Sequence, residues 1–399
     1  MAELIEPTER RIALALSGGG SRAIAFHLGC MRALEDRAIL QQVRVLSTVS
    51  GGSIIGAMYA YGGHACFGEF EEKVLGLLRK GLHKPILKAA VVSRETPRLM
   101  GTIVLNGAPT LLLGAARRVV GASRLLLGSR LRVLEAWLHG FEERLPYWGS
   151  LTTALEHVLA KDIFGDVTLS KVASTGLTVV INAGELRSGT AFRFGSDISG
   201  GWRYGSIVDG SEVKVATAVT ASAAFPLLLP PLVRRYEFDR RGVIGNARVF
   251  LVDGGVIDNL GLGVLEPGRS GDFSVNVYEP THIIASNAGR GQFPIGSTFY
   301  WAPSRLRRSF ATIYRKAQDA AYSRLHRFVE QGELSGFALI YLGQDDSKLP
   351  VRPADLVPRE AVRDYATDFA AMSQKDIALL AARGEQLTRL MVSRYLPEL

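Results

Sequence analysis

Ser50 is the residue of this chain whose type and setting point most directly to chemistry. It follows the apolar run that ends at Val49, and two glycines, Gly51 and Gly52, come directly after it. Small neighbours of this kind permit the sharp strand-to-helix turn on which α/β enzymes expose a nucleophilic serine. The pattern departs from a strict G-x-S-x-G because Thr48 stands where the first glycine would be. Ser50 is therefore a candidate nucleophile for acyl transfer.

A second glycine cluster lies 30 residues upstream and also follows an apolar run. It consists of three consecutive residues, Gly18, Gly19 and Gly20, with the basic Arg22 just beyond. Backbone N–H groups in such a loop can stabilise the oxyanion of acyl transfer, at about 3–4 kcal/mol per well-placed donor. With Ala23 the cluster also matches the dinucleotide pattern G-x-G-x-x-G/A, but that site needs an acidic residue after the next strand. The next apolar run ends at Thr48 without one, so an oxyanion hole is favoured.

The elements that must position these loops can be predicted from spacing. Residues 12–16 and 43–48 predict short buried strands, and residues 22–36 predict a helix between them because apolar residues recur at helical intervals. A strand, helix and strand of this length form a right-handed unit with parallel strands. Both glycine loops then emerge at the carboxyl edge of the sheet, where open α/β sheets bind ligands. Ser50 and the glycine cluster are therefore expected to be neighbours.

An acidic residue, Asp253, follows a third apolar run at 249–252 and precedes two glycines. An Asp-Gly pair alone predicts only a turn. At a strand end, however, the carboxylate could reach Ser50 and act as its general base. His282 or His326 could formally complete a Ser…Asp…His triad. His282 begins a strand-like run, and strand starts lie at the opposite edge of a parallel sheet, so structural histidines are favoured.

Four stretches together resemble the patatin-like phospholipase family. They are the glycine loop at 17–22, the elbow at 49–53, the segment 221–226 and Asp253-Gly254-Gly255. The resemblance spans about residues 10–265. It implies a three-layer α/β/α fold with a mostly parallel central sheet. It also implies a Ser-Asp dyad without histidine, in which Ser50 is the nucleophile and Asp253 the base. Gly18, Gly19 and Gly20 would form the oxyanion hole, and Arg22 would stabilise it or bind a phosphate.

The same resemblance implies a lipid acyl hydrolase of the phospholipase A or lysophospholipase type. Its substrate would be a phospholipid or a lysophospholipid, and it would need neither a metal nor another cofactor. Two alternatives stay open: a catalytically weak or inactive membrane-binding or regulatory module, and a soluble esterase or thioesterase. The intact Ser50 and Asp253 argue against the first, and a rate gain on vesicles would argue against the second. Cys30 and Cys66 form no disulfide framework and have no metal-ligand spacing.

The formal net charge of +9 is concentrated in one segment of the chain. Residues 79–132 contain eleven basic residues and a single acidic one, Glu95, together with Leu-rich stretches. A cationic, Leu-rich segment predicts peripheral contact with an anionic membrane. The alternative is a helical insertion whose basic side chains are solvated. The uncharged stretch at 99–116 contains Pro109 and is short for a spanning helix. Aromatic residues do not interleave the basic ones, so nucleic acid is not expected as a partner.

The chain is expected to divide into four regions. Residues 1–80 would form the first part of the α/β domain, 81–149 a basic, Leu-rich helical insertion, 150–345 the remainder of the α/β domain, and 346–399 C-terminal helices. Further strands are predicted at 281–286 and 336–342, a hairpin near 184–190 and a long helix at 304–331. The first residues lack a signal-peptide pattern, and cysteine is scarce. A cytoplasmic protein, or one bound peripherally to a membrane, is therefore expected.

Overall fold

The computed structural model describes residues 10–103, 147–173, 176–226, 228–291 and 301–399. Ten strands belong to one sheet in these ranges. They are β1 (Ile12–Leu16), β2 (Val43–Val49), β3 (Thr178–Glu185), β4 (Thr190–Gly195), β5 (Gly200–Gly201), β6 (Gly205–Ile207), β7 (Leu232–Arg240), β8 (Val243–Asp253), β9 (His282–Asn287) and β10 (Gly336–Tyr341). The strand order is β10-β9-β1-β2-β3-β4-β5-β6-β7-β8, and β3 also pairs with β8.

One half of the sheet is parallel and carries the predicted strand–helix–strand unit. Strands β10, β9, β1, β2 and β3 pair in parallel, in that order. Helix α1 (Gly20–Glu35) connects β1 to β2. Every residue of β1 is buried, as a central strand covered on both faces requires. The predicted strands at 12–16 and 43–48 and the helix between them are confirmed to within two residues.

The other half of the sheet is antiparallel and closes on itself. Strands β3 to β8 pair antiparallel in sequence order, and β8 returns to pair with β3. Short hairpins impose this arrangement, because a tight turn can join only antiparallel neighbours. One is the predicted hairpin after Glu185; another joins β7 to β8 through Arg241 and Gly242, which both have positive φ. The expectation of a mostly parallel central sheet is therefore wrong for this half.

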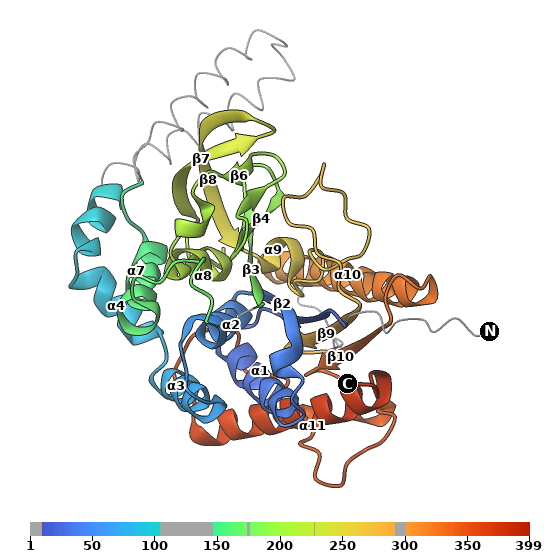
Figure 1. Ribbon diagram of the computed structural model, residues 1–399. Helices are drawn as coiled ribbons and strands as arrows, with labels where there is room; N and C mark the ends of the chain where they lie inside the picture. The colour runs from blue at the N-terminus through green and yellow to red at the C-terminus, as the bar shows by residue number, and fades with distance from the viewer. Residues whose placement is uncertain (1–9, 104–146, 174–175, 227, 292–300) are drawn as a thin grey trace.

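Helices cover both faces of the parallel half, which gives three layers (Figure 1). Alternate residues of β1, among them Leu14 and Leu16, pack into the cluster of α1 and α11 (Gln374–Tyr395). Ala13 and Ala15 face the opposite cluster, which includes Ala321 of α10 (Ala302–Glu330). Helices α1 and α11 approach closely because glycines lie at their contact. The α11 helix therefore belongs to the same core as the strands near the beginning of the chain.

Six further α-helices lie wholly within the described residues. They are α2 (Gly51–Tyr61), α3 (Phe67–Lys80), α4 (His83–Val91), α7 (Leu151–Leu159), α8 (Val215–Ala223) and the short α9 (Gly255–Asp258). A π-helix at Ala160–Phe164 continues α7, and 3-10 turns occur at Leu40–Gln42, Gly210–Glu212, Asp346–Lys348 and Arg359–Ala361. Region 346–399 holds one α-helix rather than several. Pro350, Pro353 and Pro358 disfavour helix in its first part.

Only the two ends of the predicted basic insertion fall within the described residues. Helix α4 begins it, and residues 95–103 are also helical. Residues 104–146, with Arg117, Arg118, Arg124, Arg130 and Arg132, lie outside the described residues. Among the described helices, none combines the length and the apolar character that crossing a membrane requires.

Candidate active site

Ser50 forms the tight turn between β2 and α2 that its glycine neighbours predict. Its backbone has a φ of 52° and a ψ of −118°, a region that side-chain-bearing residues rarely adopt. Such a conformation costs on the order of 1 kcal/mol and persists only where its surroundings impose it. Here the Ser50 N–H donates to the hydroxyl of Ser222 at 2.9 Å. The side chain is 7% exposed, so the hydroxyl is nearly enclosed.

Thr48, which stands in place of the usual elbow glycine, fits because another glycine faces it. A Cβ added at Gly56 of α2 would lie 2.5 Å from Thr48 Cγ2. The Thr48 hydroxyl donates to the carbonyl oxygen of Val180 at 3.2 Å and accepts from Ser53 at 3.1 Å. The β-branched residue is therefore accommodated without displacing the turn.

Asp253 meets Ser50 because β2 and β8 share one edge of β3. Strand β2 pairs with β3 as far as Val49 opposite Asn182. Strand β8 comes from the other direction and ends with Asp253 opposite Ala183. Strand β4 occupies the other edge of β3 over this stretch. The two strand ends therefore meet tip to tip, which places the carboxylate beside the serine.

The Asp253 carboxylate is buried and hydrogen-bonded on two sides. Its Oδ1 accepts from the Gly255 N–H at 2.7 Å, and the Ser50 hydroxyl is close enough to lower the pKa of the carboxylate by hydrogen bonding. Burial raises the pKa of Asp253 from 3.8 to about 6, and the two hydrogen bonds limit the rise. The carboxylate is therefore ionised at neutral pH and more basic than a solvated aspartate, as a general base should be.

The segment 221–226, singled out by its resemblance alone, connects the two candidate catalytic residues. The Ser222 hydroxyl accepts from Ser50 N–H and donates to the Asn182 carbonyl at 2.6 Å. Its own carbonyl accepts from Gly254 N–H at 3.2 Å, and the Ala224 carbonyl accepts from Asp253 N–H at 3.0 Å. This segment therefore fixes the backbone at both strand ends.

The glycine loop lies against Ser50, but its three amides are not equivalent. The Gly18 N–H donates to the backbone carbonyl of Asn259 at 3.1 Å, so it is already engaged. Within the described ranges, the amides of Gly19 and Gly20 have no hydrogen-bond partner. A Cβ on Gly51 would overlap the Gly20 backbone, so the elbow and the loop touch through glycines. Of the three amides expected to form the oxyanion hole, that of Gly18 is therefore engaged, whereas those of Gly19 and Gly20 remain free among the described residues.

Arg22 is buried beneath this loop rather than open to solvent. Its Nε donates to the Ala288 carbonyl at 3.0 Å and its Nη1 to the Tyr365 carbonyl at 2.8 Å. Burial, and secondarily the nearby Arg290, lowers the pKa of Arg22 to about 10, so it remains a cation at neutral pH. Of the carboxylates, Asp364 is near enough to raise the pKa of Arg22, but its effect is smaller than that of burial. Of the two expected roles, the position favours electrostatic support of the loop over direct phosphate binding.

A C-terminal segment at 365–372 braces the same loop, which the sequence did not predict. The Asp368 carbonyl accepts from Ser21 N–H at 2.7 Å, and a Cβ on Gly20 would overlap the Asp368 backbone. On its other side, the Phe369 carbonyl accepts from Leu82 N–H at 2.8 Å. These contacts join backbone groups, which leave no pattern of residue types that could have revealed them.

No histidine among the described residues forms a hydrogen bond with Ser50 or Asp253. His282 is at the amino end of β9, where its Nε2 contacts Glu398 at 3.1 Å, and His326 packs its ring on Phe337. His27 is fully buried between the Ser17 carbonyl and the Ser286 hydroxyl, at 2.9 and 2.8 Å. Burial lowers the pKa of His27 to about 4, so it is neutral and donates to the carbonyl. His139 lies outside the described residues.

Nothing among the described side chains suggests a metal centre. No group of three or more histidine, cysteine, aspartate or glutamate side chains converges there.

Comparison with known proteins agrees with this fold. A family model for patatin-like phospholipases matches residues 14–265, and the chain belongs to that family. Human GIVD cytosolic phospholipase A2 aligns with a TM-score of 0.52 at 13% identity, over 96% of this chain and 61% of the human protein. This chain thus spans less than two thirds of that protein's length. At such identity the likeness shows a shared fold.

Two bacterial structures align with lower scores. VipD from Legionella pneumophila gives a TM-score of 0.39 at 15% identity, over 97% of this chain and 67% of VipD. The type III effector ExoU of Pseudomonas aeruginosa gives 0.36 at 15% identity, over 97% of this chain and 53% of ExoU. No curated protein matches the sequence significantly.

Proposed function

We propose that this protein hydrolyses acyl esters of phospholipids or lysophospholipids through a Ser50–Asp253 dyad. The observation that carries the proposal is that the β2 and β8 strand ends place the Ser50 hydroxyl beside the buried Asp253 carboxylate, next to the free amides of Gly19 and Gly20. Membership of the patatin-like phospholipase family supports a lipid substrate. The raised pKa of Asp253 supports its role as a base.

The proposed reaction runs in two steps through an acyl-enzyme. Ser50 Oγ attacks the ester carbonyl carbon while Asp253 takes its proton, and the C–O bond to the alcohol then breaks as Asp253 returns the proton to the leaving oxygen. Water next attacks the acyl-serine, with Asp253 again as base, and releases the fatty acid. The amides of Gly19 and Gly20, with that of Gly51 after the nucleophile, would hold the oxyanion in both steps. The Arg22 charge beneath them would stabilise the same oxygen.

A long-chain fluorophosphonate tests the nucleophile directly, because it phosphonylates activated serines. Ser50→Ala should abolish both labelling and lipid hydrolysis, whereas Ser393→Ala, at an exposed site on α11, should preserve them. Asp253→Asn should lower turnover by several orders of magnitude, and His282→Ala should not. Labelling that persists in Ser50→Ala, or that maps to Ser222, would contradict the assignment. A wild-type protein that is not labelled at all would favour an inactive membrane-binding module.

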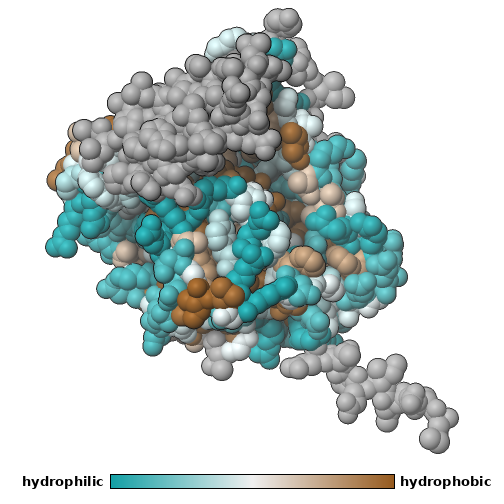
Figure 2. Space-filling view, turned by 90° about the horizontal axis from the view of Figure 1, so that it is seen from above, coloured by the Kyte–Doolittle hydropathy of each residue, from teal (hydrophilic) through white to brown (hydrophobic). Residues whose placement is uncertain are grey.

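We further propose that the surface around α4 contacts anionic membranes. Helix α4 and the turn after it expose Leu87, Val91 and Val92, and the basic Lys84 and Lys88 are exposed on the same helix. Apolar and cationic side chains together on an exposed helix are typical of segments that lie on a lipid surface. Hydrophobic residues form similar small groups among hydrophilic ones on the face seen from above (Figure 2).

Vesicle binding by two charge-matched variants distinguishes a docking surface at α4 from a general effect of the protein's positive charge. Lys84→Gln/Lys88→Gln/Arg94→Gln should weaken binding to phosphatidylglycerol vesicles, by up to about 1 kcal/mol per charge at low salt. Hydrolysis of a small soluble ester should be unchanged. A control triple variant loses the same charge at exposed sites elsewhere: Lys171→Gln, Arg352→Gln and Lys375→Gln. Equal losses in both variants would contradict a docking surface at α4. A wild type without any rate gain on vesicles would favour a soluble esterase.

A further inference from the structure

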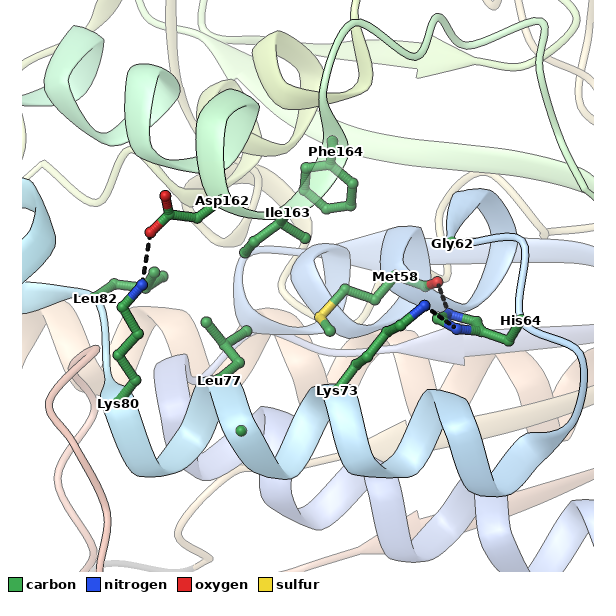
Figure 3. A pocket seen from close by; sticks show the side chains of 11 residues that line it. Met58, Gly62, His64, Lys73, Leu77, Lys80, Leu82, Asp162, Ile163 and Phe164 are labelled. Carbon is green, nitrogen blue, oxygen red and sulfur yellow. Dashed lines mark hydrogen bonds and ion pairs between the residues drawn. The ribbon is translucent and has the colours of Figure 1, made fainter.

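A cavity of about 370 Å³ lies between α2, α3 and the π-helix Ala160–Phe164, away from Ser50 (Figure 3). Its volume falls in the range of small-ligand pockets in proteins. Met58, Leu77 and Phe164 line the middle, and Lys73 and Lys80 rise from α3 toward its two ends. The cavity therefore combines an apolar middle with a cation at each end.

The π-helix gives this cavity part of its wall. In the π-helix the Gly165 N–H donates to the carbonyl of Ala160, five residues earlier, at 2.8 Å. Asp162, Ile163 and Phe164 all belong to it and all line the cavity. Such helices are rare and frequently lie at functional sites.

A helix-interior glycine, Gly76, opens the cavity from the opposite side. Glycine costs about 1 kcal/mol relative to alanine inside a helix, so it usually has a packing reason. Gly29 in α1 and Gly384 in α11 have one, because a Cβ on either would overlap the backbone of the facing helix. A Cβ on Gly76 would meet nothing within 4 Å, and Gly76 lines the cavity. Gly76 is exposed, so its missing side chain leaves open space at the cavity wall instead of permitting a close contact.

The two lysines keep hydrogen-bond donors for a ligand. Lys73 Nζ pairs with Glu69 at 2.9 Å and contacts His64 Nδ1 at 3.2 Å, whereas Lys80 Nζ pairs with Asp162 at 2.7 Å. An ammonium has three N–H groups, so each lysine retains at least one beyond these contacts. An anionic head at one end and a hydrocarbon chain across the middle would complement this lining.

We propose that this cavity binds a long-chain carboxylate, with its chain against Met58, Leu77 and Phe164 and its carboxylate at a lysine end. The ligand class rests on the function proposed above, because a fatty acid is the product of that hydrolysis. The site is separate from the catalytic pair: Ser50 precedes the first residue of α2, and Met58 lies two turns further along it, which is about 12 Å.

Dodecanoate binding to the wild type and to two glycine variants, measured by titration calorimetry, tests the site. Gly76→Leu places a side chain at the cavity wall, whereas Gly68→Leu alters another exposed glycine of the same helix, which does not line the cavity. Both variants should fold at least as stably as the wild type, because leucine favours helix over glycine. Gly76→Leu should weaken dodecanoate binding at least tenfold and leave hydrolysis of a small ester unchanged. Gly68→Leu should bind as the wild type does.

Dodecanol tests the role of the charged ends. The wild type should bind dodecanoate at least tenfold more tightly than dodecanol, and Lys73→Gln/Lys80→Gln should remove that difference. Dodecanoate binding that survives Gly76→Leu would place the ligand elsewhere, for example at Ser50, and would overturn the proposal. So would equal affinity of the wild type for the acid and the alcohol. Failure of fluorophosphonate labelling would instead refute the hydrolase, and dodecanoate binding would still report on the cavity.

Discussion

The charge of Asp253 should make the folded protein less stable as the pH rises. Burial raises the pKa of this carboxyl from 3.8 to about 6. Between these values the unfolded chain has released the proton while the folded chain still holds it. The free energy of unfolding therefore falls as the pH rises from 3.8 and levels off above about 6. A shift of about two units corresponds to about 3 kcal/mol, at about 1.4 kcal/mol per unit.

Asp253→Asn isolates this contribution, because asparagine has nearly the same shape and carries no charge. The variant should be more stable than the wild type by up to about 3 kcal/mol at pH 8, and the difference should shrink toward zero near pH 4. Urea unfolding at several pH values measures it. Asp272→Asn, at a carboxylate with 71% of its side chain exposed, is the control and should change stability little. A variant that is no more stable than the wild type at pH 8 would refute the reasoning.

The same ionisation of Asp253 should raise the activity as the pH rises, whereas it lowers the stability. Because only the ionised carboxylate can take the Ser50 proton, kcat/KM for a small ester should fall about tenfold per pH unit below about 6. The hydrogen bond from Ser50 lowers the pKa of Asp253, so Ser50→Ala should raise it further, as carboxyl NMR titration would show. An acid limb near pH 4 would indicate a solvated carboxylate and contradict the buried dyad.

Three further predictions follow from the geometry. Ser50→Gly should be more stable than Ser50→Ala by about 1 kcal/mol in urea unfolding, because glycine adopts a φ of 52° without strain. Gly56→Ala should destabilise the fold by about 1–3 kcal/mol, because the new methyl clashes with the Thr48 methyl. Adding Thr48→Ser should restore most of the loss. If the effects of the two substitutions on stability simply add, the two residues are not in contact. Burial lowers the pKa of His27 from 6.5 to about 4. Its contribution to the free energy of unfolding is therefore fully present above pH 6.5 and is lost as the pH falls through 4, by about 3 kcal/mol in total. His27→Gln should show a flatter decline in stability over this range, and an unchanged slope would argue against a buried neutral imidazole.

Local patterns accounted for the elements that carry the glycine loop and the elbow. The strand at 12–16 is a continuous apolar run because it is buried on both faces, and the helix that follows has apolar residues at helical spacing. Their handedness and length then place both glycine loops at one edge. The same reasoning put His282 at the far edge, where the structure has it. The structure of the C-terminal region was harder to predict, because a proline-containing, irregular segment has no helical or strand periodicity.

The residue types and turns of the candidate site could be predicted from the chain's residues, because they depend on near neighbours: a glycine-flanked serine, an aspartate at a strand end and a glycine loop. How these features meet depends on pairings that exist only in the folded chain. Strands β2 and β8 meet tip to tip on one edge of β3, Asn259 engages the Gly18 amide, and residues 365–372 brace the loop. These contacts join backbone groups far apart in the chain. Every residue has the same amide and carbonyl to offer, so residue types leave no sign of such pairings.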